Sequence, residues 1–195
     1  MSFKSSIKRG IPHRQPKRRF MIFCEGTNTE PWYFRSFRLV TATIRSVTPA
    51  GGNALVFVQN SIKKWQREKK DYDQCWVVFD KDQSTEQQFR DAIALAQQNK
   101  LRIACSNQAF EYWFVLHFRP HTGQPMPRAD YAGILSAELQ FPYRKDAQTA
   151  KQMYKAILNR QPEAIERAER IWILQPYQES STAVYQLVCE LNKYL

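Results

Sequence analysis

Residues 20–26 read FMIFCEG and residues 75–82 read CWVVFDKD. Each stretch is a short apolar run, typical of a buried strand, that ends in acidic residues. Glu25 follows the first run, and Asp80 and Asp82 follow the second. In open α/β sheets, ligands bind beyond the carboxyl ends of the strands. The two stretches therefore predict carboxylates gathered at one edge of a parallel sheet.

Apolar runs of strand length alternate with helical patterns up to about residue 105. Strands are predicted at 20–24, 43–48, 76–79 and 101–105, and helices at 27–39, 53–69 and from 84 onward. Short connections between such elements indicate a parallel sheet with helices on both faces. From about Arg128 the chain is mainly helical, and 172–174 has the composition of one more strand. We therefore expect an α/β fold with a mainly helical C-terminal portion.

Two helix starts carry capping signals. Thr27 and Glu30 have the spacing of a capping box, in which each side chain bonds the other residue's backbone. Ser84 and Thr85, followed three residues later by Gln87 and Gln88, give the same signal at the start of a later helix. Stabilisation of the first helical turn is thus a sufficient explanation for Glu30, and a role next to the site is left open.

Size and composition indicate one domain over 20–195. A chain of 195 residues with 43% hydrophobic residues buries a sizeable core. It contains no apolar run of about 18 residues and no apolar signal segment at its start, so we expect a cytoplasmic protein without a membrane partner. Its scattered cysteines favour buried thiols over disulfides or zinc. They are Cys24, Cys75, Cys105 and Cys189.

The net charge of +11 is concentrated at the start of the chain. Residues 1–19 hold seven basic residues and no acidic one, which predicts a flexible arm that neutralises phosphates. A solubilising terminus without a ligand is the alternative. The expected nucleic-acid contacts are Arg14, Lys17, Arg18, Arg19, Arg144 and Lys145.

The acidic residues suit a hard divalent cation. Asp80 and Asp82 straddle Lys81, so in an extended backbone both carboxylates would point to the same side. Converging carboxylate oxygens are ligands for Mg²⁺ or Mn²⁺. Gly26 permits a sharp turn after Glu25. The alternatives are a solvated strand end for Glu25 and a helix-capping pair for the aspartates, and the coincidence of the two signals favours the metal site.

Glu111 is the one acidic residue in a predicted helix, 109–118, that is apolar almost all the way round. Such a helix is buried. A carboxylate there needs a partner, a proton or a cation. We therefore add Glu111 to the candidate metal ligands, with a helix-capping role as the alternative.

Other motifs carry less information. His117 and His121 are four residues apart, but Pro120 breaks the helix that would place them on one face, which disfavours a zinc pair. The chain contains no Gly-x-Ser-x-Gly elbow, P-loop or Gly-x-Gly-x-x-Gly motif, so acyl transfer, ATP hydrolysis and dinucleotide binding lack support. Aromatic and basic residues interleave over 32–38 and could stack bases, although their helical spacing favours core positions for most of the aromatics.

Three blocks together resemble the RloB-like family: 22–34, 77–82 and 106–118. The resemblance extends from about Arg18 to the end of the chain. It implies a Toprim-like fold, in which a glutamate after the first strand and an Asp-x-Asp after a later strand form a metal site. Glu25, Asp80 and Asp82 match those positions, and Asn107 and Glu111 belong to the third block. At 180–184 the chain departs from the family pattern, which has Asn-Pro before Ser-Thr.

The resemblance also implies a biological setting. RloB-like proteins are associated with prokaryotic defence loci, often beside an ATPase of the AAA or ABC type and sometimes near restriction or CRISPR genes. Related Toprim effectors include ones that act on tRNA. An ATPase is therefore an expected partner in addition to nucleic acid, and self-association into a homo-oligomer is left open.

These parts predict a metal-dependent nuclease. Asp80 and Asp82 are expected to hold Mg²⁺, with Glu25 as general base, general acid or further ligand. Lys81, Lys145 and Arg144 are candidates for stabilising charge on the phosphate, with ordinary surface charges as the alternative. Two other functions stay open: a metal- or nucleotide-binding regulatory subunit of the ATPase, and a nucleic-acid binder that uses the arm at 1–19. The sequence leaves undecided whether RNA or DNA is cut, what the trigger is, and whether one or two metal ions bind.

Overall fold

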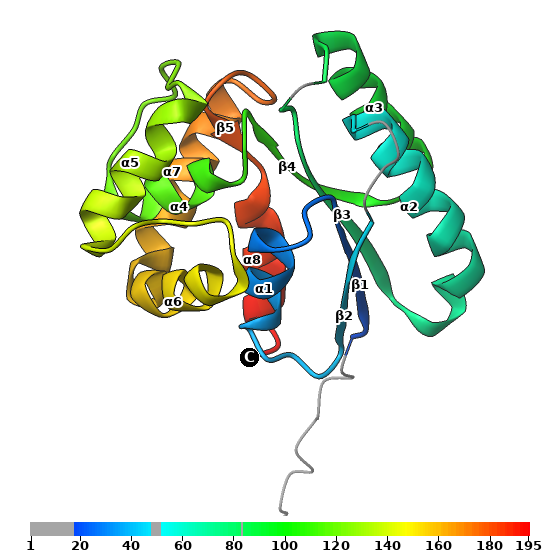
Figure 1. Cartoon of the computed structure of the whole chain (residues 1–195). Coiled ribbons are helices and arrows are strands. Elements are labelled where there is room, and N and C mark those ends of the chain that lie inside the picture. Colours follow the sequence, from blue (N-terminus) through cyan, green and yellow to red (C-terminus); the bar gives the residue numbers. More distant parts are fainter. Residues whose placement is uncertain (1–17, 48–51, 83) are drawn as a thin grey trace, which may run out of the picture.

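A five-stranded sheet lies between two groups of helices (Figure 1). The computed structural model describes residues 18–47, 52–82 and 84–195. The strand order is β2-β1-β3-β4-β5, with β1 to β4 parallel and β5 antiparallel to β4. The strands are β1 (Phe20–Cys24), β2 (Ala42–Ser46), β3 (Gln74–Asp80), β4 (Arg102–Asn107) and β5 (Ser181–Thr182). The expected α/β fold is confirmed.

The strand order creates a switch point between β1 and β3. From β1 the chain continues to β2 on one side, and it then returns to form β3 on the other side of β1. Open α/β sheets bind ligands in the crevice at such a reversal, beyond the carboxyl ends of the strands. Cys24 pairs with Val78, so Glu25 and Asp80 lie next to each other at that edge.

Side-chain alternation along the strands divides the core into two parts. Ile22 and Val78 pack on the face covered by α1, α4 and the C-terminal helices, whereas Phe23 and Val77 pack on the face covered by α2 and α3 (Figure 1). Side chains alternate between the two faces of the sheet, so the position of a residue just after a strand decides which face its side chain lies on. The helices are α1 (Thr29–Arg35), α2 (Ala54–Glu68), α3 (Glu86–Gln98), α4 (Glu111–Phe118), α5 (Arg128–Leu139), α6 (Ala147–Ile157), α7 (Gln161–Leu174) and α8 (Val184–Asn192).

Local sequence accounts for several of these boundaries. Thr85 and Gln88 form the predicted capping box at the start of α3, and the Asn53 side chain accepts a hydrogen bond from Val56 N–H at the start of α2. Helix α4 is buried from Glu111 to His117, as its apolar composition predicts. Cys24, Cys75 and Cys105 are buried free thiols, and Cys189 is a half-buried one.

Three local predictions were wrong. Helix α1 ends at Arg35 rather than near residue 39, and Asn28, not Thr27, is its N-cap and makes no side-chain capping bond. The segment 172–174 forms the last turn of α7, because Trp172 follows a buried helical stripe of Ala164, Ala168 and Ile171. Strand β5 was missed, since two polar residues give no strand pattern.

No helix within the described ranges is both long enough and apolar enough to span a bilayer. Most of the basic arm, including Arg14 and Lys17, lies outside the described residues.

Candidate active site

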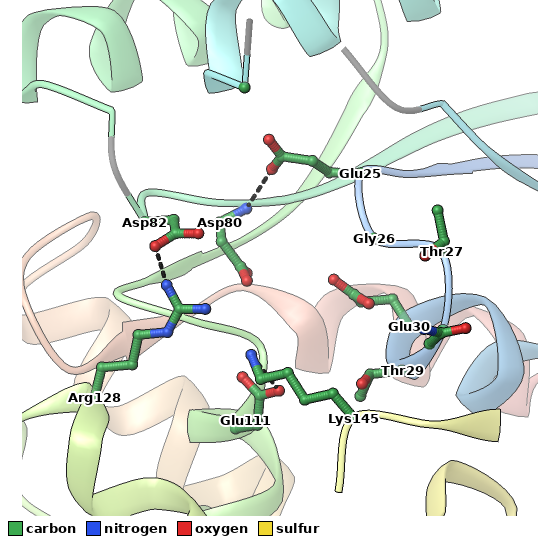
Figure 2. A pocket seen from close by; sticks show the side chains of 12 residues that line it. Glu25, Gly26, Thr27, Thr29, Glu30, Asp80, Asp82, Glu111, Arg128 and Lys145 are labelled. Atoms are coloured by element: carbon green, nitrogen blue, oxygen red, sulfur yellow. Dashed lines mark hydrogen bonds and ion pairs between the residues drawn. The ribbon is translucent and has the colours of Figure 1, made fainter. Parts of the chain in front are cut away.

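A pocket of about 420 Å³ opens at the carboxyl edge of the sheet, beside the switch point (Figure 2). Its charged lining comes from the ends of β1 and β3 and the residues just after them, from α1 and α4, from the first residue of α5, and from the segment that precedes α6. Five carboxylates take part, those of Glu25, Glu30, Asp80, Asp82 and Glu111, together with the cations Arg128 and Lys145. The structure thus brings together the four predicted metal ligands and adds Glu30 to them.

Asp80 is the last residue of β3, and alternation places its side chain on the face that holds Trp76 and Val78. There it points towards the α1 and α4 side of the pocket (Figure 2). Its Oδ1 atom is buried and has no hydrogen-bond partner in the described part of the chain. Burial raises the pKa of this carboxyl group well above its ordinary value, and the charges of Glu30 and Glu111 raise it further.

Glu25 lies two residues after Phe23, so the two side chains share a face of the sheet. The Glu25 side chain therefore lies on the side of α2 and α3. Its Oε2 atom accepts a hydrogen bond from the Asp80 backbone N–H at 3.2 Å. Burial raises the pKa of Glu25, and this hydrogen bond offsets part of the shift. The two carboxylates therefore flank the end of β3 from opposite sides.

Glu30 occupies the buried stripe of α1, one turn before Tyr33 and Phe34. Only 8% of the residue is exposed, so it does not serve as the solvent-facing capping residue that its spacing suggested. Burial raises the pKa of Glu30 to about 7, and the charge of Glu111 contributes to the shift. The close approach of Gly26 allows this placement, because a Cβ at Gly26 would collide with the Glu30 carboxylate.

Glu111 begins α4 and is 3% exposed. The partner that such a buried carboxylate requires is Lys145, whose Nζ lies 2.8 Å from Glu111 Oε1. The Tyr143 hydroxyl also donates a hydrogen bond to Oε1, at 3.3 Å. Both partners come from the segment that leads into α6, which closes one side of the pocket (Figure 2).

Asp82 differs from Asp80 in both backbone and environment. Its φ of 37° takes it out of the extended conformation, so the prediction that both aspartates project from an extended segment was wrong. The Asp82 side chain is 44% exposed and forms an ion pair with Arg128, the first residue of α5. Both aspartates still line the pocket, one buried and one at its mouth.

The remaining predicted residues lie around or away from this pocket. Lys81 is ion-paired with Glu86 at 2.8 Å. Asn107 is buried at the end of β4, where its Nδ2 donates to the Tyr177 carbonyl at 2.9 Å. Neither belongs to the pocket lining, and Arg144 is exposed outside it. Arg18 and Arg19 precede β1, so they lie at the opposite edge of the sheet from Glu25.

The segment 180–184, which departs from the expected family pattern, forms strand β5. Ser181 and Thr182 are buried and pair with the end of β4. The hydroxyl groups of Thr182 and Ser106 lie 2.9 Å apart. This segment therefore packs against the strand that precedes Asn107.

The donor set fits a hard divalent cation. In the described part of the chain, no group of three or more His, Cys, Asp or Glu side chains is placed so that together they could hold a metal ion. Mg²⁺ needs only one or two carboxylates, because it keeps several of its waters. The unpartnered Asp80 Oδ1 and the like charges around it favour a cation at this place. Arg128 and Lys145 currently neutralise two of the five carboxylates.

Sequence reasoning missed Arg128, and it explained Glu30 first by helix capping while leaving a role next to the site open. Arg128 is 46 positions from Asp82 in the chain, and no local pattern links the two residues. Glu30 did carry a signal, because it stands in the i, i+3, i+4 and i+7 stripe of Tyr33, Phe34 and Phe37. An acidic residue in an apolar stripe is a candidate for a buried functional carboxylate.

Comparison with known proteins gives one match. A family model described as RloB-like protein matches residues 20–191, which includes every residue of the pocket. No curated protein and no solved structure matches the chain.

Proposed function

This chain belongs to the RloB-like family, and from that premise we propose that it is a metal-dependent nuclease. The reaction is hydrolysis of phosphodiester bonds in RNA, possible tRNA substrates included, or in DNA, with Mg²⁺ or Mn²⁺ as cofactor. The observation that carries the proposal is the Asp80 carboxylate, buried at the switch point among acidic neighbours with one oxygen unpartnered. Such a group needs a proton or a cation, and we propose that the cation is a divalent metal ion.

The charge distribution supports a polyanionic substrate. The protein carries a net charge of +11, yet five carboxylates converge on one pocket. Acidic groups repel phosphates, so this pocket alone would exclude nucleic acid. With Mg²⁺ or Mn²⁺ held by these carboxylates, their charge would be neutralised, and the ion would supply polarisation of the scissile phosphate and a lower pKa for a bound water.

The protein's own residues have separate roles in this proposal. Asp80 and Asp82 hold the ion, with Glu111 and Glu30 as further buried carboxylates on the same side. Glu25 lies across the end of β3 and accepts the proton of the attacking water. Its raised pKa brings it closer to neutral pH, where a general base works best. Lys145 and Arg128 bind phosphate oxygens by charge-assisted hydrogen bonds once they release their carboxylate partners.

Family membership extends the proposal to a biological setting. We place the nuclease in a prokaryotic anti-phage or CRISPR-associated defence system, in the cytoplasm, with an ATPase of the AAA or ABC type as partner. The ATPase would control access of the substrate to the pocket.

The test compares wild-type protein with Asp80→Asn on labelled RNA and DNA, with Mg²⁺, with Mn²⁺ and with a chelator. We expect cleavage that needs metal and a loss of at least about 100-fold in Asp80→Asn. Glu86→Gln is the matched control, because Glu86 is an exposed carboxylate outside the pocket. If Asp80→Asn cuts as fast as wild type, the site is wrong. If metal binds but no substrate is cut and the protein copurifies with an ATPase, the regulatory-subunit function replaces the nuclease.

A further inference from the structure

A basic groove runs between α1 and α6, next to the acidic pocket. It has a volume of about 560 Å³, and its charged walls are Arg35, Arg38, Lys151 and Lys155, with the half-buried Trp32 between them. The Arg35 guanidinium lies 5.0 Å and the Lys151 ammonium 4.2 Å from the centre of the Trp32 ring. The groove thus combines an aromatic surface with four positive charges.

No acidic residue neutralises this groove within the ranges that the structure describes. None of the four cations forms an ion pair there, although seven ion pairs occur elsewhere. Helix α6 contains no acidic residue, and the one in α1, Glu30, is buried in the pocket. Four uncompensated cations, on α6, on α1 and at Arg38 just after α1, attract a polyanion.

The two helices that form the groove both start beside the pocket. Thr29 and Glu30 line the pocket and start α1, whereas Lys145 lines it two residues before the start of α6 (Figure 2). The two helices pack against each other. From Ala147 to Lys155 the rise along α6 is about 12 Å, a length that a few nucleotides can span.

We propose that this groove binds a single-stranded segment of nucleic acid that continues from the phosphate in the pocket. The inference rests on the proposed function for the identity of that phosphate, and it specifies the substrate as single-stranded next to the cleavage site. Arg35, Arg38, Lys151 and Lys155 contact the backbone, and a base stacks on Trp32. A duplex would keep its bases paired and leave the Trp32 ring unused.

Stacking of a base on Trp32 should contribute more affinity than the cation–π contacts that Arg35 and Lys151 make with this ring. A base stacked on an aromatic side chain contributes roughly 5- to 150-fold in affinity. An exposed cation–π contact contributes roughly 2- to 5-fold. A base therefore displaces the flexible Lys151 ammonium from the ring and frees it to contact a phosphate.

The experiment measures binding without cleavage. Fluorescence anisotropy in the presence of a chelator compares single-stranded and duplex oligonucleotides of about 12 residues, as RNA and as DNA. We expect tighter binding of the single strand. The logarithm of the binding constant falls as the logarithm of the salt concentration rises, and each phosphate contact on a single strand contributes about 0.7 to the steepness of this line. We expect Lys151→Ala/Lys155→Ala to make the line less steep by about 1.4.

The matched control is Lys63→Ala/Lys64→Ala, which removes the same charge from exposed positions on α2, across the sheet. Trp32→Leu keeps an apolar side chain without the stacking surface and is expected to weaken binding roughly 5-fold or more. All four lysines are exposed, so these variants test the groove even if Trp32→Leu folds poorly.

Three results would overturn the inference: equal affinity for duplex, equal behaviour of the two double-lysine variants, or unchanged binding by folded Trp32→Leu. Failure of the nuclease proposal is a separate result. If the groove binds single strands but no metal supports cleavage, the groove stands and the nuclease does not. If single strands are cut at the normal rate by the groove variants, the nuclease stands and the groove does not.

Discussion

Lys145 holds its ammonium 2.8 Å from the carboxylate of Glu111, a residue that is 3% exposed. The lysine itself is half exposed, so a flexible surface cation neutralises a buried acid. The pair reduces the repulsion among the five carboxylates of the pocket.

Lys145→Met should destabilise the metal-free protein by about 1–2 kcal/mol, between the values for exposed and buried pairs, because Glu111 loses its cation. Added Mg²⁺ should restore more stability to the variant than to wild type. Thermal unfolding with and without Mg²⁺ measures both effects. Lys63→Met is the control, since Lys63 is exposed and has no ion pair in the described structure. Equal unfolding of the two variants would contradict this account of the pair.

Glu30→Gln should change how stability depends on pH. The pKa of Glu30 is about 7 in the folded protein against 4.5 ordinarily, so the folded state binds more protons between these values and loses stability as pH rises. The variant should therefore match wild type near pH 4.5 and exceed it by about 3 kcal/mol at pH 8 without metal. Denaturant unfolding at several pH values measures the difference.

Variant and wild type must be compared at each pH, because the contribution of His117 to stability changes with pH in the opposite direction to that of Glu30. Burial lowers the pKa of His117 to about 3, so its contribution to stability rises with pH between 3 and 6.5. This contribution cancels when the two proteins are compared. Glu163→Gln, on an exposed residue of α7, should show no such pH-dependent gain.

Affinity for Mg²⁺ or Mn²⁺ should rise with pH. Burial and like charges raise the pKa values of Asp80 and Glu30, so without metal these groups retain protons that a cation must displace. Titration calorimetry in buffers of different ionisation enthalpy should detect proton release, and the dissociation constant should fall between about pH 5.5 and 8. Binding that is independent of pH, or without proton release, would exclude these two groups as ligands.

Gly26→Ala should damage the pocket through Glu30. The added methyl group would collide with the Glu30 carboxylate, so either that side chain or the turn after β1 must move. We expect a loss of about 1–3 kcal/mol in stability and weaker metal binding. Gly133→Ala in α5 is the control, because a Cβ there meets no atom within 4 Å and a helical alanine is favourable. Thermal unfolding and metal titration of both variants separate a specific collision from a general effect of the substitution.

Much of the fold followed from local patterns. The apolar runs at 20–24 and 76–79 became β1 and β3, and the capping pair Thr85 and Gln88 began α3 where predicted. Apolar runs and caps act within a few residues, so their consequences are readable without the rest of the chain. The predicted start of α1 was wrong, because Glu30 is buried instead of forming the capping box that its spacing from Thr27 suggested.

Local patterns in the sequence establish that Glu25, Asp80 and Asp82 follow apolar strands and that Glu111 lies in an apolar helix. The direction in which each carboxylate faces, and the cation that it meets, depend on how distant elements pack together. Strand alternation and the β2-β1-β3-β4-β5 order place Glu25 and Asp80 on opposite sides of one sheet edge. Packing of α4, α5 and α6 then brings Glu111, Arg128 and Lys145 to that edge from distant parts of the chain. Charge interactions depend on distance and burial, which sequence separation does not encode.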